Sequence, residues 1–317
     1  MIEIIRPADR DAWLAARTKD VTASVAGALF GVDPYSSPYE LWAEKTGRRS
    51  PDGEPSDAME RGILMEPVVV KMVQKRHPSW VIGYDGDNPV YYRDPETRIG
   101  ATPDAFVVRP DRRGTGIMQI KSVSEDAFEK FWEIDPDNGD VIPPTWIAIQ
   151  AIVEATLTNC PWACVAVVVL TRRGTFRLEP IIDIPLDNFE FWDRLVEKVR
   201  AFWDLVATGE APDPDWDRDG DAVLDVLRQS LPERRDLTHD HHINDLAGLY
   251  VEAKAKATEQ AAIADRIRPQ IIHALGAAEL GETERWHISA RTSIRVDGSK
   301  TRVLRIKPRE PHHAAGF

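Results

Sequence analysis

The chain has 317 residues, which is enough for one large domain or for one domain with an appendage. Hydrophobic residues make up 43% of the sequence and charged residues 29%, the balance of a soluble globular protein. No apolar run is long enough to span a membrane, the N-terminal residues form no apolar signal segment, and two cysteines are too few for a disulfide scaffold or a structural zinc site. We therefore expect a cytoplasmic protein without a membrane partner.

The formal net charge of -12 weighs against a nucleic-acid partner but does not exclude one. Acid is concentrated in one stretch, because six Asp and a single Arg occur between Asp213 and Asp225. Carboxylates that hold metal ions would add to the count as well. A nucleic-acid partner therefore stays open as a hypothesis.

The first part of the chain alternates between helical and extended patterns. Residues 23–31 and 37–47 predict helices that each end at a glycine. Residues 58–76 carry an apolar helical face with Glu66 near its middle, and Pro67 predicts a kink or a new helix start there. Short β-rich runs separated by turn residues follow. They cover residues 88–94, 101–110 and 115–124.

Helical periodicity returns after these strands. Residues 146–159 predict a helix, and residues 164–184 predict two strands about a tight turn at Gly174. Residues 186–209 predict an amphipathic helix. This mixture predicts an α/β domain over residues 1–210.

The remainder of the chain has a different composition. Residues 211–240 are predicted to form an acidic linker. Residues 243–275 are rich in Ala, Glu and Lys with heptad-like apolar spacing and predict one long helix. Residues 286–307 predict a β-hairpin that turns at Asp297–Gly298. We expect residues 241–317 to form a helical extension and a β-hairpin that end in a disordered tail.

A group of polar residues lies within the predicted helices and strands of the first part. Glu66 comes from a helix, Asp104 from the end of a strand, and Gln119 and Lys121 from the next strand. Positions two apart on a strand share a face, so Gln119 and Lys121 point the same way while Ile120 points to the core. Taken alone, Pro-Asp followed by Gln-x-Lys is a weak signal and favours a turn residue and two exposed strand residues.

The order of these residues suits metal-dependent phosphodiester hydrolysis. Divalent metals held by carboxylates neutralise oxyanions and lower the pKa of bound water. Mg²⁺ keeps several waters, so two or three protein oxygens suffice, and the backbone carbonyl of Ile120 can supply one of them. Lys121 would orient the attacking water or stabilise charge that develops on the phosphate. We therefore expect Mg²⁺ as the cofactor, with Mn²⁺ as a substitute.

Several stretches between Trp13 and Leu170 carry a family resemblance. They read RTKDVTAS, GVDPYSSPYELWAEKTG, RGILMEP, GATPDAF, MQIKS and WIAIQAIVEATL. With these stretches, the chain resembles the YqaJ-type viral recombinase nucleases, the PD-(D/E)xK group that includes lambda exonuclease and the RecE nuclease domain. The resemblance implies a deoxyribonuclease with a restriction-endonuclease-like core, in which helices flank a central mixed sheet.

The resemblance also implies metal ligands and catalytic residues. Glu66, Asp104 and Gln119 would be metal ligands within the catalytic site, assisted by the Ile120 carbonyl. Lys121 would be the catalytic lysine.

Further residues follow from the same resemblance. Gln150, on the following helix, would be the active-site glutamine. Arg17 and Ser24 match the segment that holds a DNA 5′-phosphate in the exonuclease members. Local Lys and Arg residues would add phosphate contacts. The candidates are Lys71, Lys75, Arg76, Arg112 and Arg113.

Gln119 departs from the family pattern, which has an acidic residue at this position. A Gln carbonyl can ligate Mg²⁺ but brings no charge. Losing one negative charge near a divalent ion costs on the order of several kcal/mol at an effective dielectric near 20. We therefore expect weaker metal binding at a second ion site, with the first site intact and activity retained.

The predicted function is a 5′-to-3′ exonuclease on linear double-stranded DNA that generates single-stranded overhangs for phage-type recombination by single-strand annealing. The resemblance implies double-stranded DNA ends as the substrate, a RecT- or Beta-like annealing protein as a partner, and a ring-shaped homo-oligomer. It also implies a phage or prophage gene expressed in a bacterial host cell. Two alternatives stay open: an endonuclease or other DNA-repair nuclease with the same core, and a non-catalytic DNA-end-binding module in which Gln119 marks lost activity.

Overall fold

The computed structural model describes residues 1–50, 57–86, 88–187, 189–294 and 297–309. The chain divides into an N-terminal unit, Met1–Ser230, and a C-terminal unit, Leu231–Phe317. Among the described residues, no helix combines the length and the apolar character needed to cross a membrane.

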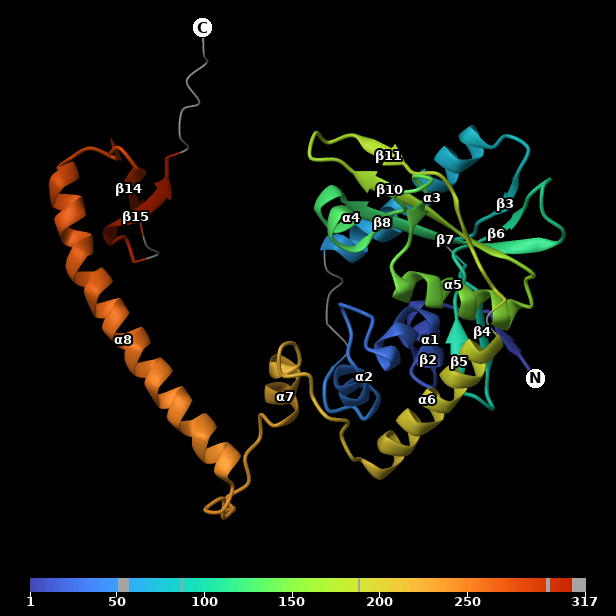
Figure 1. The fold of residues 1–317 in the computed structure, drawn as a ribbon, viewed down its shortest axis with the longest axis horizontal. Helices are drawn as coiled ribbons and strands as arrows, with labels where there is room; N and C mark the ends of the chain where they lie inside the picture. The colour runs from blue at the N-terminus through green and yellow to red at the C-terminus, as the bar shows by residue number, and fades with distance from the viewer. Residues whose placement is uncertain (51–56, 87, 188, 295–296, 310–317) are drawn as a thin grey trace, which may run out of the picture. The chain divides into compact units, whose positions relative to one another are not determined.

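A mixed sheet of six strands lies at the centre of the N-terminal unit (Figure 1). β7 and β10 run parallel, β6 and β3 continue the sheet antiparallel beyond β7, and β11 and β12 each pair antiparallel with β10. β10 has the sequence ACVAVVVL, and this apolar run is typical of a strand covered on both faces. The strands are β3 Val81–Gly83, β6 Ala105–Val108, β7 Thr115–Ser124, β10 Ala163–Leu170, β11 Phe176–Leu178 and β12 Ile182–Ile184.

Helices cover both faces of this central sheet. On one face, Val69 of α3 (Asp57–Arg76) belongs to a buried cluster with Ile120 of β7. On the other face, α5 (Thr145–Thr158) packs in a cluster that contains Ile117 of β7. The predicted α/β class, with a central mixed sheet flanked by helices, is confirmed.

A smaller sheet supports the N-terminal segment. Its strands, in spatial order, are β1 Glu3–Ile5, β4 Tyr91–Asp94, β5 Ile99–Ala101 and β2 Val21–Thr22. The buried carboxylate of Asp20 accepts hydrogen bonds from the Tyr91 hydroxyl at 2.9 Å and from Arg93 Nε and Nη2 at 2.8 and 2.9 Å. These bonds tie β4 to the segment that precedes β2.

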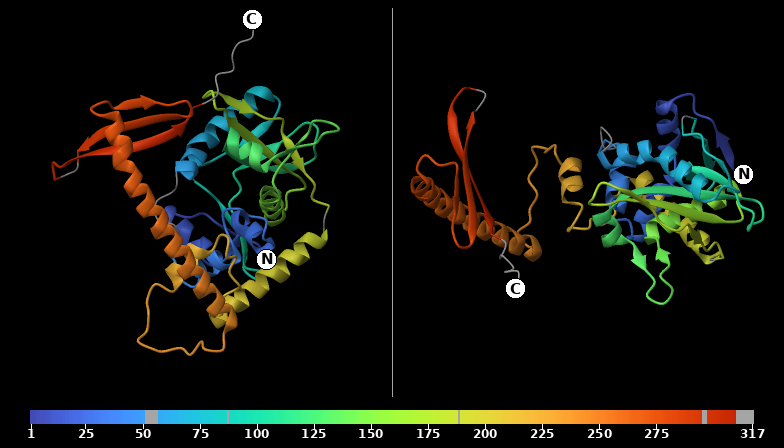
Figure 2. Two further views of the ribbon diagram at one scale, coloured as in Figure 1. Left: turned by 60° about the vertical axis from the view of Figure 1, so that its left-hand side comes forward. Right: turned by 90° about the horizontal axis from the view of Figure 1, so that it is seen from above.

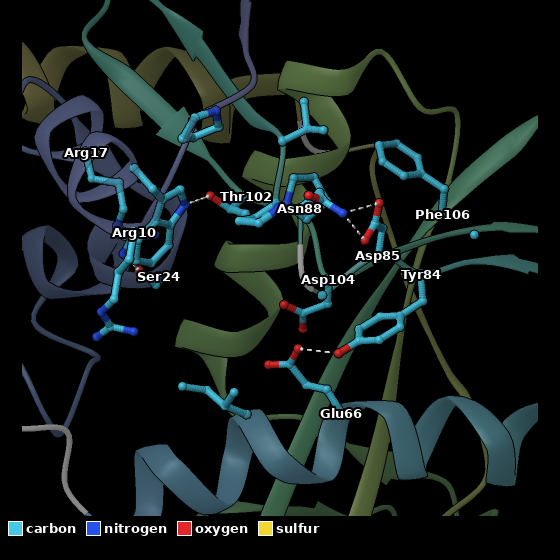
Figure 3. Close-up of a pocket in the computed structure, with 18 of the residues that line it drawn as sticks. Arg10, Arg17, Ser24, Glu66, Tyr84, Asp85, Asn88, Thr102, Asp104 and Phe106 are labelled. Carbon is cyan, nitrogen blue, oxygen red and sulfur yellow. Dashed lines mark hydrogen bonds between the residues drawn. The ribbon is translucent and has the colours of Figure 1, made fainter.

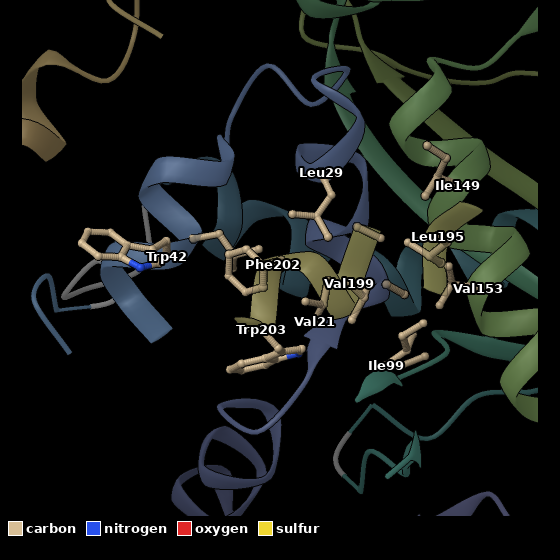
Figure 4. Close-up of a cluster of buried hydrophobic side chains, with 14 of the residues drawn as sticks. Val21, Leu29, Trp42, Ile99, Ile149, Val153, Leu195, Val199, Phe202 and Trp203 are labelled. Atoms are coloured by element: carbon tan, nitrogen blue, oxygen red, sulfur yellow. The ribbon is translucent and has the colours of Figure 1, made fainter. Parts of the chain in front are cut away.

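A third apolar cluster joins the smaller sheet to the surrounding helices (Figure 4). It contains Val21 and Ile99 from the smaller sheet, Val153 from α5, and Leu195 and Phe202 from a long helix near the end of the unit. The helices not yet named in this unit are α1 Arg10–Arg17, η1 Ala23–Phe30, α2 Pro38–Lys45, α4 Glu125–Phe131, α6 Phe189–Thr208 and α7 Gly220–Val226, and a small hairpin is formed by β8 Glu133–Ile134 and β9 Val141–Ile142.

Two local predictions differ from the structure. The sequence predicted a kink or a new helix start at Pro67, and Pro67 lies inside the single helix α3, so no new helix starts there. The kink stays a prediction. The segment 23–31 forms a 3-10 helix that ends at Gly31, whose positive φ of 68° suits glycine. The N-terminal unit also continues past the predicted boundary at residue 210, because Ala222 of α7 is buried in its apolar cluster.

The C-terminal unit consists of one long helix and a small antiparallel sheet (Figure 2). The predicted helix is α8, His241–Leu275, and the predicted hairpin consists of β14, Trp286–Ile294, and β15, Lys300–Pro308. A short strand, β13 (Leu280–Glu282), adds a third member that the sequence did not indicate. The sequence predicted a disordered tail over residues 308–317, but Pro308 belongs to β15 and the Arg309 N–H donates to the carbonyl of Arg285, so the prediction is wrong for these two residues. Residues 310–317 of the predicted tail lie outside the described residues.

Candidate active site

Two carboxylates, one from a helix and one from the start of a strand, approach each other. Glu66 lies in α3, directly before Pro67, and Asp104 immediately precedes the first residue of β6. Figure 3 shows their carboxylates pointing toward one another, with the Tyr84 side chain beside Glu66. The Tyr84 hydroxyl donates a hydrogen bond to Glu66 Oε2 at 3.3 Å. This bond orients one carboxylate of the pair.

Strand β7 presents the next two residues of the site. Ile120 is buried on the α3 side of the sheet, so the alternation along the strand turns Gln119 and Lys121 toward α5. Lys121 Nζ donates to Oε1 of Gln150, on α5, at 2.9 Å. The lysine ammonium is thereby held in place by an uncharged acceptor.

Gln119 occupies the position that the family pattern gives to an acid. Its side chain is buried, and Nε2 donates to Asp104 Oδ2 and, at 3.4 Å, to the carbonyl of Ile120. The Ile120 N–H also donates to Asp104 Oδ2, at 2.7 Å. Gln119 Oε1 is buried without a hydrogen-bond partner among the described residues. The amide therefore satisfies Asp104 and leaves one oxygen unused.

The environment of both carboxylates disfavours negative charge. Burial, followed by the charge of Asp104, raises the pKa of Glu66 to about 7. Burial also raises the pKa of Asp104, opposed by the Lys121 charge and by hydrogen bonds from the Ile120 N–H and from Gln119. A cation placed near both carboxylates would favour their charged forms.

Glu154 is a member of this site that the sequence analysis missed. It lies one helical turn after Gln150 on α5, and its Oε1 accepts from Gln150 Nε2 at 3.0 Å. Its side chain is fully buried, and its Oε2 has no partner among the described residues. Burial and then the charge of Asp104 raise the pKa of Glu154 well above its ordinary value. The i, i+4 spacing from Gln150 was the only signal for it in the sequence.

A cavity of about 720 Å³ connects the carboxylates to the N-terminal helix. Its lining includes Glu66, Asp104 and Gln150 together with Arg17 and Ser24 (Figure 3). The structure thus brings the two predicted phosphate-binding residues into the same pocket as Glu66, Asp104 and Gln150. Gln119, Ile120 and Lys121 are not among the described residues that line it. The roles of all these residues stay predictions.

Arg17 is held by its neighbours at the side of this pocket. Its Nη2 donates to Ser24 Oγ at 3.2 Å, and its guanidinium carbon lies 4.3 Å from the ring centroid of Trp13. Trp13 Nε1 in turn donates to Thr102 Oγ1 at 3.0 Å. Trp13 is a second residue of the site that the sequence analysis did not predict.

The five other cations predicted to contact phosphate do not line the pocket. Arg76 Nη1 donates to the carbonyl of Glu179 at 3.0 Å, and Arg112 Nη2 forms an ion pair with Asp183 at 2.6 Å. Of the lining residues that the structure describes, Arg10 and Arg17 carry positive charge. Three of the five lie on α3 and two lie in the loop between β6 and β7, outside this lining. Their contacts with phosphate stay predictions.

The side-chain oxygens of the site determine which metal ion it could hold. No cluster of three or more His, Cys, Asp or Glu side chains suited to a metal occurs in the described part of the chain. Glu66 and Asp104 supply two carboxylates, and Gln119 Oε1 is a buried oxygen without a partner. Mg²⁺ accepts one or two carboxylates and completes its shell with water. The residues therefore fit a hard divalent ion with fewer charges than three acids would give.

Comparison with known proteins finds a family model that matches this part of the chain. Residues 12–160 match the YqaJ-like viral recombinase domain, which confirms the resemblance to that family. The uncharacterised protein YqaJ of Bacillus subtilis (strain 168) is 26% identical over 282 residues, which are 86% of this chain and 80% of YqaJ.

Two solved structures overlap with the chain to a lesser degree. Both are of LHK-Exo, an alkaline exonuclease from Laribacter hongkongensis, and the second contains dAMP. The TM-scores are 0.45 and 0.41 at 19% and 18% sequence identity, and each overlap covers 68% of this chain and 99% of LHK-Exo.

Proposed function

We propose that the chain is a metal-dependent deoxyribonuclease that degrades linear double-stranded DNA from its 5′ ends. A nuclease that acts on DNA is the general class of this proposal, and the match of residues 12–160 to the YqaJ-like viral recombinase domain supports that class. The observation that carries the chemistry is the meeting of two carboxylates, Glu66 and Asp104, with the Lys121–Gln150 pair in one site.

Glu66 and Asp104 would hold Mg²⁺ or Mn²⁺, together with Gln119 Oε1 and the Ile120 carbonyl. A bound divalent ion supplies Lewis acidity and lowers the pKa of a water ligand. Gln119 can offer its oxygen only after its amide turns, since Nε2 faces Asp104. Metal binding would therefore exchange one hydrogen bond for one coordination bond.

Lys121 would stabilise the negative charge that develops on the phosphate or orient the attacking water. Its ammonium keeps donors free for this purpose, because it donates to Gln150 Oε1 with one of its three protons. Gln150 fixes the position of the ammonium without neutralising it. This arrangement supports charge stabilisation at a defined point in the site.

Arg17 and Ser24 would bind the terminal 5′-phosphate at the other side of the pocket. The stacking of Arg17 over Trp13 and its bond to Ser24 hold the guanidinium in one orientation before DNA arrives. A 5′-phosphate held here would set which nucleotide reaches the carboxylates. This geometry favours an exonuclease over an endonuclease.

The biological setting is proposed from the family. The overhangs would serve phage-type recombination by single-strand annealing, with a RecT- or Beta-like protein as the partner. A ring-shaped homo-oligomer acting in a bacterial host cell would suit this role.

The test uses linear duplex DNA with 5′-phosphate or 5′-hydroxyl ends and a closed circular duplex, each with Mg²⁺, Mn²⁺ or EDTA. Wild type should release nucleotides from the 5′-phosphorylated linear DNA in both metals and leave the circle intact. Lys121→Ala should lose this activity, whereas Lys198→Ala, which removes an exposed lysine of α6, should keep it. Cutting of the circle would identify an endonuclease instead.

The hydrogen bond from Gln119 to Asp104 favours a second candidate, a non-catalytic module that binds DNA ends. In that case, wild type would bind linear DNA but remain inactive at every metal concentration. Gln119→Glu would then restore cleavage, because it returns the missing carboxylate.

A further inference from the structure

Positive charge is concentrated in the last strands of the chain. Residues 285–309 contain eight Lys or Arg and one Asp, although the whole chain has a net charge of -12. This stretch corresponds to β14, β15 and their immediate flanks. A local excess of this size marks a candidate surface for a polyanion.

The register of β14 and β15 places three of these cations on one face of the sheet. Directly opposed residues of an antiparallel pair share a face, and so do residues two apart on a strand. Arg305 and Lys307 are therefore neighbours about 7 Å apart, and Arg291 lies diagonally across from Arg305. We call this side the basic face. It consists of His287, Ser289, Arg291, Ser293, Thr301, Val303, Arg305 and Lys307.

The three cations of the basic face are available to a ligand. Arg291, Arg305 and Lys307 are exposed, and within the described ranges their side chains have no hydrogen bond or ion pair. The one acidic contact on this side joins Glu282 to His287, 3.2 Å apart at the margin. The cations therefore present unneutralised charge to solvent.

Arg302, on the other face of the sheet, binds backbone carbonyls of the same unit. It alternates to the opposite side of β15, and its guanidinium donates to the carbonyls of Gly276, at 2.6 Å, and of Ala278 and Ala290. Arg268 of α8 donates to the Arg302 carbonyl at 2.7 Å. These bonds attach the sheet to the end of α8 and leave the basic face as the free side.

We propose that the basic face binds the sugar-phosphate backbone of duplex DNA outside the catalytic pocket. The choice of DNA among polyanions rests on the proposed function, whereas the binding of a polyanion rests on the face itself. Phosphate contacts come from Lys and Arg with hydroxyl donors beside them, and Ser289, Ser293 and Thr301 supply such hydroxyls. The pocket has only Arg10 and Arg17 as described cationic lining residues, so further phosphate contacts must come from elsewhere.

The test compares wild type with a triple variant of the full chain, Arg291→Gln, Arg305→Gln and Lys307→Gln. Binding of a fluorescently labelled duplex is measured by anisotropy in EDTA, where metal-dependent cleavage does not proceed, at several salt concentrations. We expect about tenfold weaker binding at 0.1 M salt and a slope of log K against log salt that is less steep by about 3, because each phosphate contact contributes about 0.9.

The matched control removes the same charge from α8 and the segment before it by Arg235→Gln, Lys254→Gln and Arg266→Gln, which are also exposed and whose side chains have no hydrogen bond or ion pair within the described ranges. It should keep the wild-type slope. Equal slopes in wild type and the basic-face variant would overturn the proposal, and so would equal losses in both triple variants, since total charge would then explain them. Thermal unfolding should be the same for all three proteins because none of the substituted side chains has a hydrogen bond or ion pair within the described ranges.

Two further outcomes distinguish DNA binding by the basic face from the proposed nuclease function and from contact with a second copy of the chain. Wild type that binds DNA with the expected slope but never cleaves it with metal would remove the proposed nuclease function and leave this inference standing. If the basic-face variant binds DNA normally but sediments as a smaller species than wild type, the face contacts a second copy of the chain, and the proposal is wrong.

Discussion

The two units of the chain use positive charge differently. The N-terminal unit has 26 Lys or Arg against 40 Asp or Glu, and the C-terminal unit has 14 against 12. In the N-terminal unit, arginines bind carboxylates: Arg93 to Asp20 at 2.8 Å and Arg109 to Asp111 at 2.7 Å. On the basic face, none of the three cations has such a partner among the described residues.

This difference teaches that net charge says little about where a polyanion binds. Arg93 and Arg109 are neutralised by carboxylates that hold segments together, so they add little affinity for phosphate. The unpaired cations of the C-terminal sheet retain their full charge toward solvent. Chemistry and backbone binding would then lie in different units, and this division can be tested.

The largest expected effect separates the two units directly. Asp104→Asn removes a proposed metal ligand while leaving the basic face unchanged. We expect cleavage to fall on the order of a thousandfold, because metal-assisted hydrolysis requires the carboxylate, while DNA binding in EDTA and its salt slope stay as in wild type. Rates with Mg²⁺ and anisotropy in EDTA check the two parts.

Asp137→Asn, at an exposed turn residue, is the matched control and should change neither quantity. A salt slope in Asp104→Asn that matches the slope of the basic-face variant would contradict the division between units.

Glu154 gives the next largest effect, through Gln150. Glu154→Leu removes the acceptor of the Gln150 amide, so the amide can turn and Lys121 loses its fixed partner. We expect kcat to fall by about 10- to 100-fold, the range seen when supporting hydrogen bonds of metal sites are lost, with KM for DNA unchanged. Steady-state kinetics on a labelled duplex measure both.

Glu154→Gln keeps an oxygen that can accept from Gln150 and should retain most of the activity. If Glu154→Gln is as inactive as Glu154→Leu, the charge of Glu154 matters rather than the orientation of Gln150.

Much of this site could be predicted from the sequence, because the patterns that indicate it lie within short segments. β7 was recognisable from its apolar run, and period-two alternation then placed Gln119 and Lys121 together. Glu154 and Trp13 were not found, because the burial of Glu154 and the bond from Trp13 to Thr102 depend on contacts between distant segments. No new helix starts at Pro67, because the packing of α3 against the sheet overrides the preference of proline for a helix end.

Gln119→Glu should sharpen the comparison by changing only the N-terminal unit. An added carboxylate strengthens attraction to a divalent ion, and water displaced from the same position offsets part of the gain. We expect the half-saturating Mg²⁺ concentration to fall by about tenfold, with no change in DNA binding in EDTA. Cleavage rates across a Mg²⁺ titration measure this shift.

Gln119→Leu, which has no oxygen, should need more Mg²⁺ than wild type. Wild-type activity that is already saturated at micromolar Mg²⁺ would show that the missing charge has no consequence for metal binding.

The smallest expected effect concerns the stability of the metal-free protein. Because the folded-state pKa of Glu66 is raised from 4.5 to about 7, its contribution to stability is fully present below pH 4.5 and is lost as the pH rises through 7. The full shift corresponds to about 3 kcal/mol, and screening by water in the open pocket reduces the expected loss to about 1 kcal/mol. Glu66→Gln should therefore be more stable than wild type at pH 8 in EDTA and no more stable at pH 4.5.

Urea unfolding of wild type and Glu66→Gln at both pH values measures this difference, with Glu133→Gln, an exposed glutamate, as the control. Mg²⁺ should stabilise wild type at pH 8 more than Glu66→Gln, because the cation relieves the repulsion between Glu66 and Asp104. The basic-face variant should show no such pH-dependent gain, since no pair of carboxylates lies beside its cations. An equal gain for Glu66→Gln at both pH values would mean that the glutamine packs better, and charge repulsion in the N-terminal unit would not be its cause.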